Sequence, residues 1–249
     1  MKIGILIPTT TFKTKFKKLE DTFLFKICLP SLLNTINNQH TYELYLAIDD
    51  NDKVYSKLQN HKKLLNKNTY KNINKNIKLS PHILSTKKIE KGNVVGYWNM
   101  CYEKAYNDNC EYFVQCGDDI IFYDKNWLDQ CIHHLKLNMD YGVSTPVDIR
   151  NKDLMTQSVV SRKHYELFGY YYPPELKSWF CDNYITDLYK DSLGVFIRAR
   201  LENKGGDPRY TPPDWETTKQ LCAKLVEKDM KILKIHINQS CQIQIPKLE

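Results

Sequence analysis

Short apolar runs alternate along the chain with longer stretches in which apolar residues recur at helical spacing. Three of the short runs occupy residues 2–8, 42–48 and 112–116. The third is short and largely apolar, which is typical of a central strand buried on both faces of a sheet. Weaker runs at residues 83–85 and 142–146 predict two further strands.

The stretches between these runs predict helices. Residues 19–36 carry apolar side chains at helical spacing, although Pro30 must kink or break that helix. Residues 93–107 and 127–137 each place apolar residues on one helical face. The alternation of strands and helices predicts an α/β fold with a mostly parallel central sheet flanked by helices.

The C-terminal part predicts a loop, a helix and a last strand. Residues 202–210 are rich in glycine and proline, so we expect a mobile loop there. Thr211 as N-cap and Pro212 at the first helical position predict a helix that reaches about Lys228. Residues 231–237 predict the final strand.

The strongest chemical signal is a pair of acids, Asp118 and Asp119, at the end of the run 112–116. Two carboxylates flanked by apolar residues are costly to bury without a cation. A hard divalent ion would compensate them and would also bind diphosphate oxygens. In open α/β sheets, ligands bind beyond the carboxyl ends of the strands, where these acids fall. On the dipeptide alone, a turn whose aspartates cap a helix or face water is an equally good interpretation.

A second acidic cluster follows the run 42–48 and consists of Asp49, Asp50, Asn51 and Asp52. Aspartate and asparagine are ordinary turn formers, so the cluster alone favours a turn. Its position is more informative, because a second acidic strand end in the same sheet could line the same crevice.

Two single residues are further candidates. Asp182 lies among the aromatic residues between Trp179 and Tyr184, which would raise its pKa and suit it to general-base work. A helix-start aspartate is the alternative. His236 lies near the end of the predicted last strand and could bind Mn²⁺, although a lone histidine is more often a packed or surface residue.

The net charge of +7 raises the question of nucleic-acid binding. The aromatic residues concentrate in apolar segments and not between the basic clusters, which argues against a nucleic-acid platform. We interpret the excess lysine as surface composition. A positive field would also suit an anionic nucleotide donor.

The chain carries no apolar run of about 18 residues, so we expect no transmembrane helix. Its start does not resemble a signal peptide. The eight cysteines include no CxxC pair, and we expect reduced thiols in a cytoplasmic protein.

Taken together, the order of these motifs resembles the GT-A fold glycosyltransferases, most closely the inverting family 2 type. The Lys- and Asn-rich composition also resembles that of enzymes from large DNA viruses with AT-rich genomes. The resemblance covers residues 1–240 and rests on several short motifs in a fixed order: Pro8–Thr9–Thr10–Thr11, Asp49–Asp50, a Lys91–Gly92–Asn93 turn before a helix with Asn99, Gly117–Asp118–Asp119, Asp182 and His236.

The resemblance implies one domain, with residues 1–120 as the donor-binding half and residues 121–249 as the acceptor-binding half. It implies that Asp119 binds Mn²⁺ or Mg²⁺ directly, with His236 as a late metal ligand. Gly117 stands where the family's Asp-x-Asp motif has its first acid. Contacts with the nucleotide or its sugar are implied for Thr9, Thr10, Asp49 or Asp50, Lys91, Asn99 and Asp118.

The resemblance also implies that Asp182 is the catalytic base. Asn183 takes the place of a second acid that family motifs often carry, so Glu175 remains an alternative base. Arg209, in the predicted loop, could reach the diphosphate of the donor; this rests on its charge and position and not on a motif.

These expectations describe a metal-dependent glycosyltransferase of the hexosyltransferase type. It would move a sugar from a nucleotide-diphosphate sugar, with UDP as the default, to a hydroxyl of a glycan, glycolipid or protein, with inversion. A nucleotidyltransferase that makes nucleotide sugars is a second possibility, but residues 8–11 are not the Gly-rich basic loop such enzymes carry. A non-catalytic nucleotide- or sugar-binding module is a third.

Overall fold

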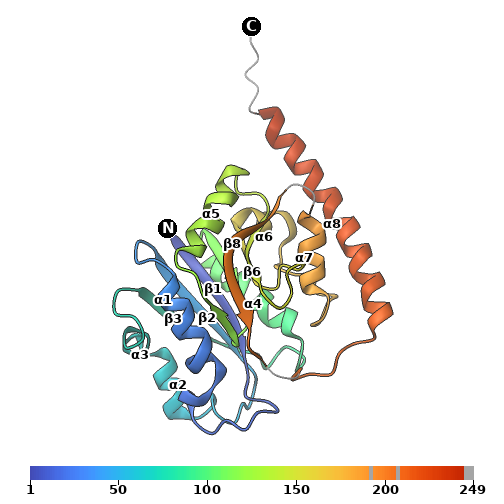
Figure 1. Ribbon diagram of the computed structural model, residues 1–249. Helices are drawn as coiled ribbons and strands as arrows, with labels where there is room; N and C mark the ends of the chain where they lie inside the picture. Colours follow the sequence, from blue (N-terminus) through green and yellow to red (C-terminus); the bar gives the residue numbers. More distant parts are fainter. Residues whose placement is uncertain (191–192, 206–207, 244–249) are drawn as a thin grey trace.

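A sheet of eight strands runs through the computed structural model, with helices on both of its faces (Figure 1). The structure describes residues 1–190, 193–205 and 208–243. The strand order is β3-β2-β1-β4-β7-β6-β8-β5. The strands are β1 Lys2–Thr9, β2 Thr41–Ile48, β3 Lys78–Ser85, β4 Tyr112–Gln115, β5 Ile120–Phe122, β6 Val143–Asp148, β7 Ser158–Ser161 and β8 Gly194–Asn203.

Four parallel strands, β3, β2, β1 and β4, form the first half of the sheet. Because they are parallel, their carboxyl ends meet at one edge, and the acids that follow β2 and β4 lie on that edge. Beyond β4, strand β7 is antiparallel to both β4 and β6. Strand β8 is parallel to β6, and β5 is antiparallel to β8. The predicted α/β fold with a mostly parallel sheet is confirmed.

The helices cover both faces of the sheet and bury the apolar residues of β1 between them. On one face, Leu29 and Leu32 pack with Ile3 and Ile5; on the other, α4 packs against Leu6. The helices are a 3-10 turn Leu19–Asp21, a π-helix Leu24–Cys28, α1 Leu29–Thr35, α2 Leu58–Leu65, α3 Lys67–Lys71, α4 Val94–Asn107, α5 Trp127–Leu137, α6 Arg162–Phe168, α7 Cys181–Tyr189 and α8 Trp215–Ile243.

Pro30 does not break the first predicted helix but lies where its hydrogen-bonding pattern changes. The π-helix runs directly into α1 with helical backbone at Cys28 and Leu29, and Pro30 lies in the first turn of α1, a position that tolerates the missing N–H. Within the described part of the chain, no helix is long and apolar enough to cross a membrane.

The C-terminal segment differs from the prediction. Helix α8 runs without interruption through residues 231–237, so the predicted last strand is wrong. No glycine or proline separates this stretch from the preceding helix, and Leu233 continues the buried face that begins at Cys222 and Leu225. The helix begins after Asp214, whose carboxylate accepts from Thr217 N at 2.9 Å. Asp214, and not Thr211, therefore caps it.

The loop predicted at residues 202–210 is also shorter than expected. Strand β8 continues to Asn203, because residues 201–203 pair with β5. Residues 206–207 lie outside the described part of the chain.

Two substitutions in α8 test its helical register. Leu233 is 4% exposed and Ile235 is 56% exposed. We expect Leu233→Ala to lower the free energy of unfolding by about 2 kcal/mol or more, and Ile235→Ala to change it by less than about 0.5 kcal/mol. Urea unfolding of both variants measures this. Equal losses would contradict the helix, since a strand would place both residues on one face.

Candidate active site

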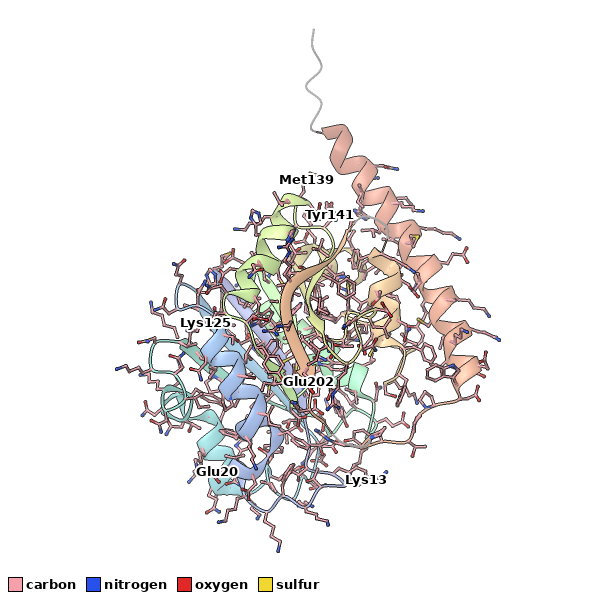
Figure 2. The ribbon with its side chains drawn as sticks, in the orientation of Figure 1. Lys13, Glu20, Lys125, Met139, Tyr141 and Glu202 are labelled. Atoms are coloured by element: carbon pink, nitrogen blue, oxygen red, sulfur yellow. The ribbon has the colours of Figure 1, made fainter. Side chains whose placement is uncertain are left out.

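A cavity of about 770 Å³ opens at the carboxyl ends of β1 and β4. This is the edge of the sheet where open α/β folds bind ligands. Figure 2 shows Lys13 at the end of the molecule toward which β1 runs. The cavity is lined by Pro8, Thr9, Thr10, Lys13, Thr14, Lys15, Phe16, Phe23, Val94, Tyr97, Trp98, Gly117, Asp118, Asp119, Asn203, Pro208, Arg209 and Tyr210.

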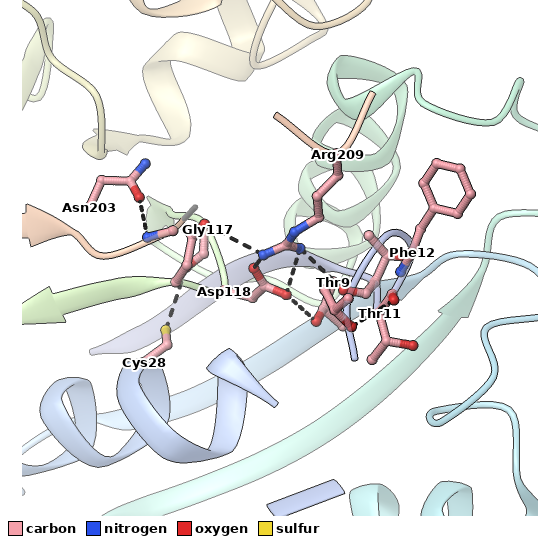
Figure 3. A network of polar contacts seen from close by, with 12 residues as sticks. Thr9, Thr11, Phe12, Cys28, Gly117, Asp118, Asn203 and Arg209 are labelled. Atoms are coloured by element: carbon pink, nitrogen blue, oxygen red, sulfur yellow. Dashed lines mark hydrogen bonds and ion pairs between the residues drawn. The ribbon is translucent and has the colours of Figure 1, made fainter. Parts of the chain in front are cut away.

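Asp118 is held by an arginine from a distant part of the chain. Arg209 Nη1 and Nη2 donate to the two oxygens of Asp118 at 3.1 and 2.7 Å, a bidentate pair (Figure 3). Thr9 Oγ1 donates to Asp118 Oδ2 at 2.6 Å. Burial lowers the pKa of Arg209, but the charge of Asp118 and its hydrogen bonds outweigh this effect, so the pKa is raised overall. The guanidinium therefore stays charged.

Asp119 is less well compensated than Asp118. Its Oδ2 lies 3.5 Å from Arg209 Nη2, which already serves Asp118. Burial and the charge of Asp118 raise the pKa of Asp119 to about 6, although Arg209 acts in the opposite direction. Two carboxylates thus share one guanidinium, and the pair retains a negative charge.

Two glycines flank the Asp119 carboxylate. A Cβ on Gly117 would lie 2.8 Å from Asp119 Oδ1, and one on Gly205 would lie 2.0 Å from Asp119 Oδ2. The glycine that replaces the first acid of the expected motif is therefore required by the close approach of Asp119. The turn is fixed by Gly117 N, which donates to Gln157 Oε1 at 2.8 Å, and by Lys204 N, which donates to Asp119 O at 2.9 Å.

Asp49, at the end of β2, lies directly behind the cavity wall. It is 3% exposed and accepts hydrogen bonds from three hydroxyl groups of residues that line the cavity. These come from Thr10 (3.1 Å), Tyr97 (2.9 Å) and Tyr210 (2.6 Å). Asp49 is a buried acceptor around which one end of the cavity is built.

Aromatic and basic side chains surround the Tyr210 ring beside Asp49. The ring stacks on Phe12, with centroids 5.6 Å apart, and packs on the face of Gly92, where a Cβ would lie 2.9 Å from the ring. Lys91 Nζ lies 4.2 Å from the centroid of Phe12 and 3.9 Å from Asp49 Oδ2. The φ of +87° at Gly92 and its contact with Tyr210 both favour glycine in the Lys91–Gly92–Asn93 turn.

The other acids of the second cluster have different surroundings. Asp52 is buried and binds Thr11 N, Val54 N and Tyr55 N, so it fixes the turn after β2 against the end of β1. Asp50 is exposed and lies against a smaller cavity beside the main one. Asp52 therefore stabilises a turn, as the cluster alone suggested. Asp49 instead binds hydroxyl groups of residues that line the cavity.

Asp182 lies in the first turn of α7. Burial raises the pKa of its carboxyl to about 7, and the charge of Asp148 acts in the same direction. Asp182 is therefore a helix-start aspartate, and the raised pKa expected for it is also present. Its role as a base stays a prediction. Asp182 does not line the cavity itself. The segment before Asp182 contacts helix α4, which lines the cavity through Val94: the next residue, Val95, donates its N–H to Lys177 O at 3.0 Å.

Other predicted site residues lie elsewhere. His236 is exposed on α8. It was proposed as a metal ligand at the end of a predicted strand, and no strand is present there. Asn99 uses its amide to hold the backbone of Tyr171 and Tyr172, with contacts of 2.7 to 3.1 Å. Glu175 is exposed on the segment before α7.

Several cavity residues were not singled out from the sequence. Tyr97 and Tyr210 carry hydroxyls that bind Asp49, and neither stands in a motif. Lys13 and Lys15 were interpreted as surface composition, but both line the cavity. Their position directly after the Pro8–Thr11 segment was the available signal.

The fold and the cavity together define the class: an α/β domain of the GT-A type, with its acids gathered at the sheet edge. Among solved structures it is similar to S. aureus TarS 1-349 in complex with UDP-GlcNAc, with a TM-score of 0.59 and 14% identity, over 92% of this chain and 66% of that chain. The structure of S. aureus TarS matches with a TM-score of 0.51 and 15% identity, over 82% of this chain and 37% of that chain. No family profile and no curated protein matches the sequence.

The raised pKa of Asp182 predicts a pH-dependent stability. The folded protein keeps a proton on Asp182 up to about pH 7, whereas an unfolded chain releases it near about pH 4. The stability contributed by the protonated form is therefore lost as the pH rises through about 7. We expect Asp182→Asn to gain stability relative to the wild type as the pH rises from about 5 to about 8.

Urea unfolding at a series of pH values measures this difference. Asp187→Asn, an exposed position on the same helix, is the control. A difference between Asp182→Asn and the wild type that does not change with pH would contradict the raised pKa.

Proposed function

We propose that the protein is a metal-dependent glycosyltransferase that uses a nucleotide-diphosphate sugar. The observation that carries this proposal is one cavity with a buried hydrogen-bond acceptor, Asp49, behind one end and the Asp118–Asp119 pair at the other. We assign the nucleoside to the first end and a cation to the second. The cavity's volume of about 770 Å³ is in the range of small-molecule sites. The similarity in fold to TarS, solved with UDP-GlcNAc, supports the same donor class.

The Asp49 end suits a base that can donate a hydrogen bond. An ionised carboxylate only accepts hydrogen bonds. Uracil and guanine each carry a ring N–H that could donate to it, whereas cytosine and adenine could donate only through an exocyclic amine. Phe12 offers a stacking surface for any of these bases, and UDP is proposed among them because TarS, which is similar in fold, was solved with UDP-GlcNAc. Thr10 and Lys91 would complete the nucleoside contacts.

The Asp118–Asp119 end suits a hard divalent cation. One negative charge of the pair is uncompensated by Arg209, and carboxylate oxygens are the ligands that Mn²⁺ and Mg²⁺ prefer. No group of three or more His, Cys, Asp or Glu side chains within the described residues could hold a metal by itself. Asp119 would therefore hold the ion jointly with the donor diphosphate, without His236. When bound, the ion supplies Lewis-acid stabilisation of the leaving diphosphate.

The protein's own cations would hold the rest of the diphosphate. Lys13 and Lys15 line the cavity and carry the positive charge that an anionic donor requires. Residues 1–120 form most of the donor site in this proposal, and Arg209 and Tyr210, from the half 121–249, line the same cavity. Asp118 would hold Arg209 and Thr9 in place at this end of the cavity.

Asp182 would act as the base toward the acceptor hydroxyl. Its pKa of about 7 is matched to proton abstraction near neutral pH. Attack from the face opposite the diphosphate would invert the configuration. An aromatic side chain could stack on an acceptor sugar. Trp179 is 37% exposed, whereas Tyr171 and Tyr172 are fully buried in the core, so Trp179 is the candidate for this contact.

A panel of nucleotide sugars tests the function directly. We expect a UDP-sugar to raise the melting temperature in the presence of Mn²⁺, and to release UDP slowly in the absence of an acceptor. EDTA should remove both effects. Release of pyrophosphate from a sugar phosphate and a nucleoside triphosphate would instead indicate a nucleotidyltransferase. Binding without turnover for every acceptor class would favour a binding module.

Asp119→Asn tests the metal assignment. The amide keeps the size of the side chain and removes a charge that burial already disfavours, so the fold should persist. We expect the transfer rate to fall by at least about a hundredfold, together with the loss of Mn²⁺-dependent donor binding. Asp124→Asn, an acid outside the cavity lining, is the control. Turnover near that of the wild type would contradict the assignment.

Asp182→Asn and Glu175→Gln together identify the base. We expect the first to retain donor affinity and lose transfer, and the second to behave like the wild type. The transfer rate of the wild type should fall as the pH decreases through about 7, because the base becomes protonated. If Glu175→Gln lost transfer instead, Glu175 would be the base. Steady-state kinetics over a pH series measures both variants.

A further inference from the structure

We propose that the segment Pro208–Tyr210 is an internal ligand of the donor site: it binds the polar groups that the donor needs until the donor replaces it there. Its two long side chains line the two chemically distinct ends of the cavity. Arg209 lies at the cation end and Tyr210 at the nucleoside end. This inference rests on the proposed function, since it assigns the donor as the competitor.

At the cation end, Arg209 occupies the place of an external cation. Its guanidinium binds both oxygens of Asp118 and approaches Asp119 to 3.5 Å, and it also donates to Thr10 O at 3.2 Å. The side chain is 17% exposed, so the pair is largely removed from water. Arg209 thus partly neutralises two buried carboxylates that would otherwise be unpaired.

At the nucleoside end, Tyr210 has the features of a base. It presents a planar ring that stacks on Phe12 at an interplanar angle of 18°, and a hydroxyl that donates to Asp49 at 2.6 Å. A uracil ring would present the same combination, a flat face and one hydrogen-bond donor. Tyr210 therefore uses the same acceptor and the same stacking surface that the nucleoside would need.

Asp49 keeps hydrogen-bond partners when the Tyr210 bond is removed. Tyr97 donates to Asp49 Oδ1 at 2.9 Å, and the Thr10 hydroxyl, whose single proton Asp49 and Asp52 share, lies 3.1 Å from Asp49 Oδ2. The removal of Tyr210 therefore leaves a carboxylate that remains hydrogen-bonded and gains an open position toward the cavity. This arrangement suits an exchange of one donor for another.

The exchange has a measurable consequence. A ligand that binds only when the segment has moved away binds with an apparent affinity reduced by the fraction of molecules in which the site is free. Weakening the hold of the segment should therefore tighten donor binding. A purely structural role for Tyr210, or a direct role in holding the nucleoside, predicts unchanged or weaker binding.

Tyr210→Phe is the first test. It keeps the stacked ring and removes the hydrogen bond to Asp49. We expect the dissociation constant for UDP in the presence of Mn²⁺, measured by calorimetry, to decrease about fivefold. Tyr123→Phe is the matched control, because the Tyr123 hydroxyl also donates to a carboxylate, Glu202, but lies outside the cavity lining. Equal or weaker binding by Tyr210→Phe would overturn the proposal.

A disulfide provides the second test. A Cβ added at Gly92 would lie 3.5 Å from the Tyr210 Cβ, within the range that disulfides span. In the Gly92→Cys, Tyr210→Cys double variant, oxidised glutathione takes up the two electrons and two protons that the thiols lose and fixes the segment in place. Because this variant lacks the Tyr210 ring, it tests the cation end, where the fixed segment keeps Arg209 on Asp118. We expect at least tenfold weaker UDP binding by the oxidised protein than by the same protein after reduction with dithiothreitol.

The reduced double variant carries the same strain at position 92, so it is the matched control. Equal binding by the oxidised and reduced forms would overturn the inference while leaving the proposed function intact. The absence of UDP binding by the wild type, by Tyr210→Phe and by the reduced double variant would instead contradict the proposed function itself.

Discussion

The structure depends on how it accommodates acids at one edge of its sheet. Asp49 and Asp118 are buried, and Asp119 is half-buried, so little water reaches their carboxylates. Other polar groups offset this cost: hydroxyls from the β1 end and α4 bind Asp49, and Arg209 binds Asp118 and approaches Asp119.

Much of this arrangement could be predicted from the sequence, because it depends on local patterns. The apolar runs of the buried strands and the acids after them identified the sheet and its functional edge. The sequence could not show that Arg209 pairs with Asp118, because 90 residues separate them and no motif contains the arginine. The strand predicted at residues 231–237 was wrong because Leu233 packs on the same buried face of α8 as Cys222 and Leu225, so the helix continues through this stretch.

The candidate base shows the opposing demands of stability and chemistry. Burial of Asp182 raises its pKa to about 7 and so disfavours the ionised form that a base requires near neutral pH. The helix start at which it lies offsets part of this cost, because the N-terminus of a helix favours negative charge. A residue that is fully stabilised as a carboxylate would be a weaker base. The balance at Asp182 between burial and the helix N-terminus is therefore consistent with catalysis.

The two glycines at Asp119 bear on how chains of this kind can be recognised. A Cβ at Gly117 would lie 2.8 Å from Asp119 Oδ1 and one at Gly205 would lie 2.0 Å from Asp119 Oδ2, so a side chain at either position would displace that carboxylate. Gly205 lies 88 positions after Gly117, so the two glycines that leave room for Asp119 are far apart in the sequence. A sequence search that requires an acid at the first position of the Asp-x-Asp motif would miss any chain in which glycine stands there to leave room for the second aspartate. The informative signature is instead a pair of distant glycines around one aspartate.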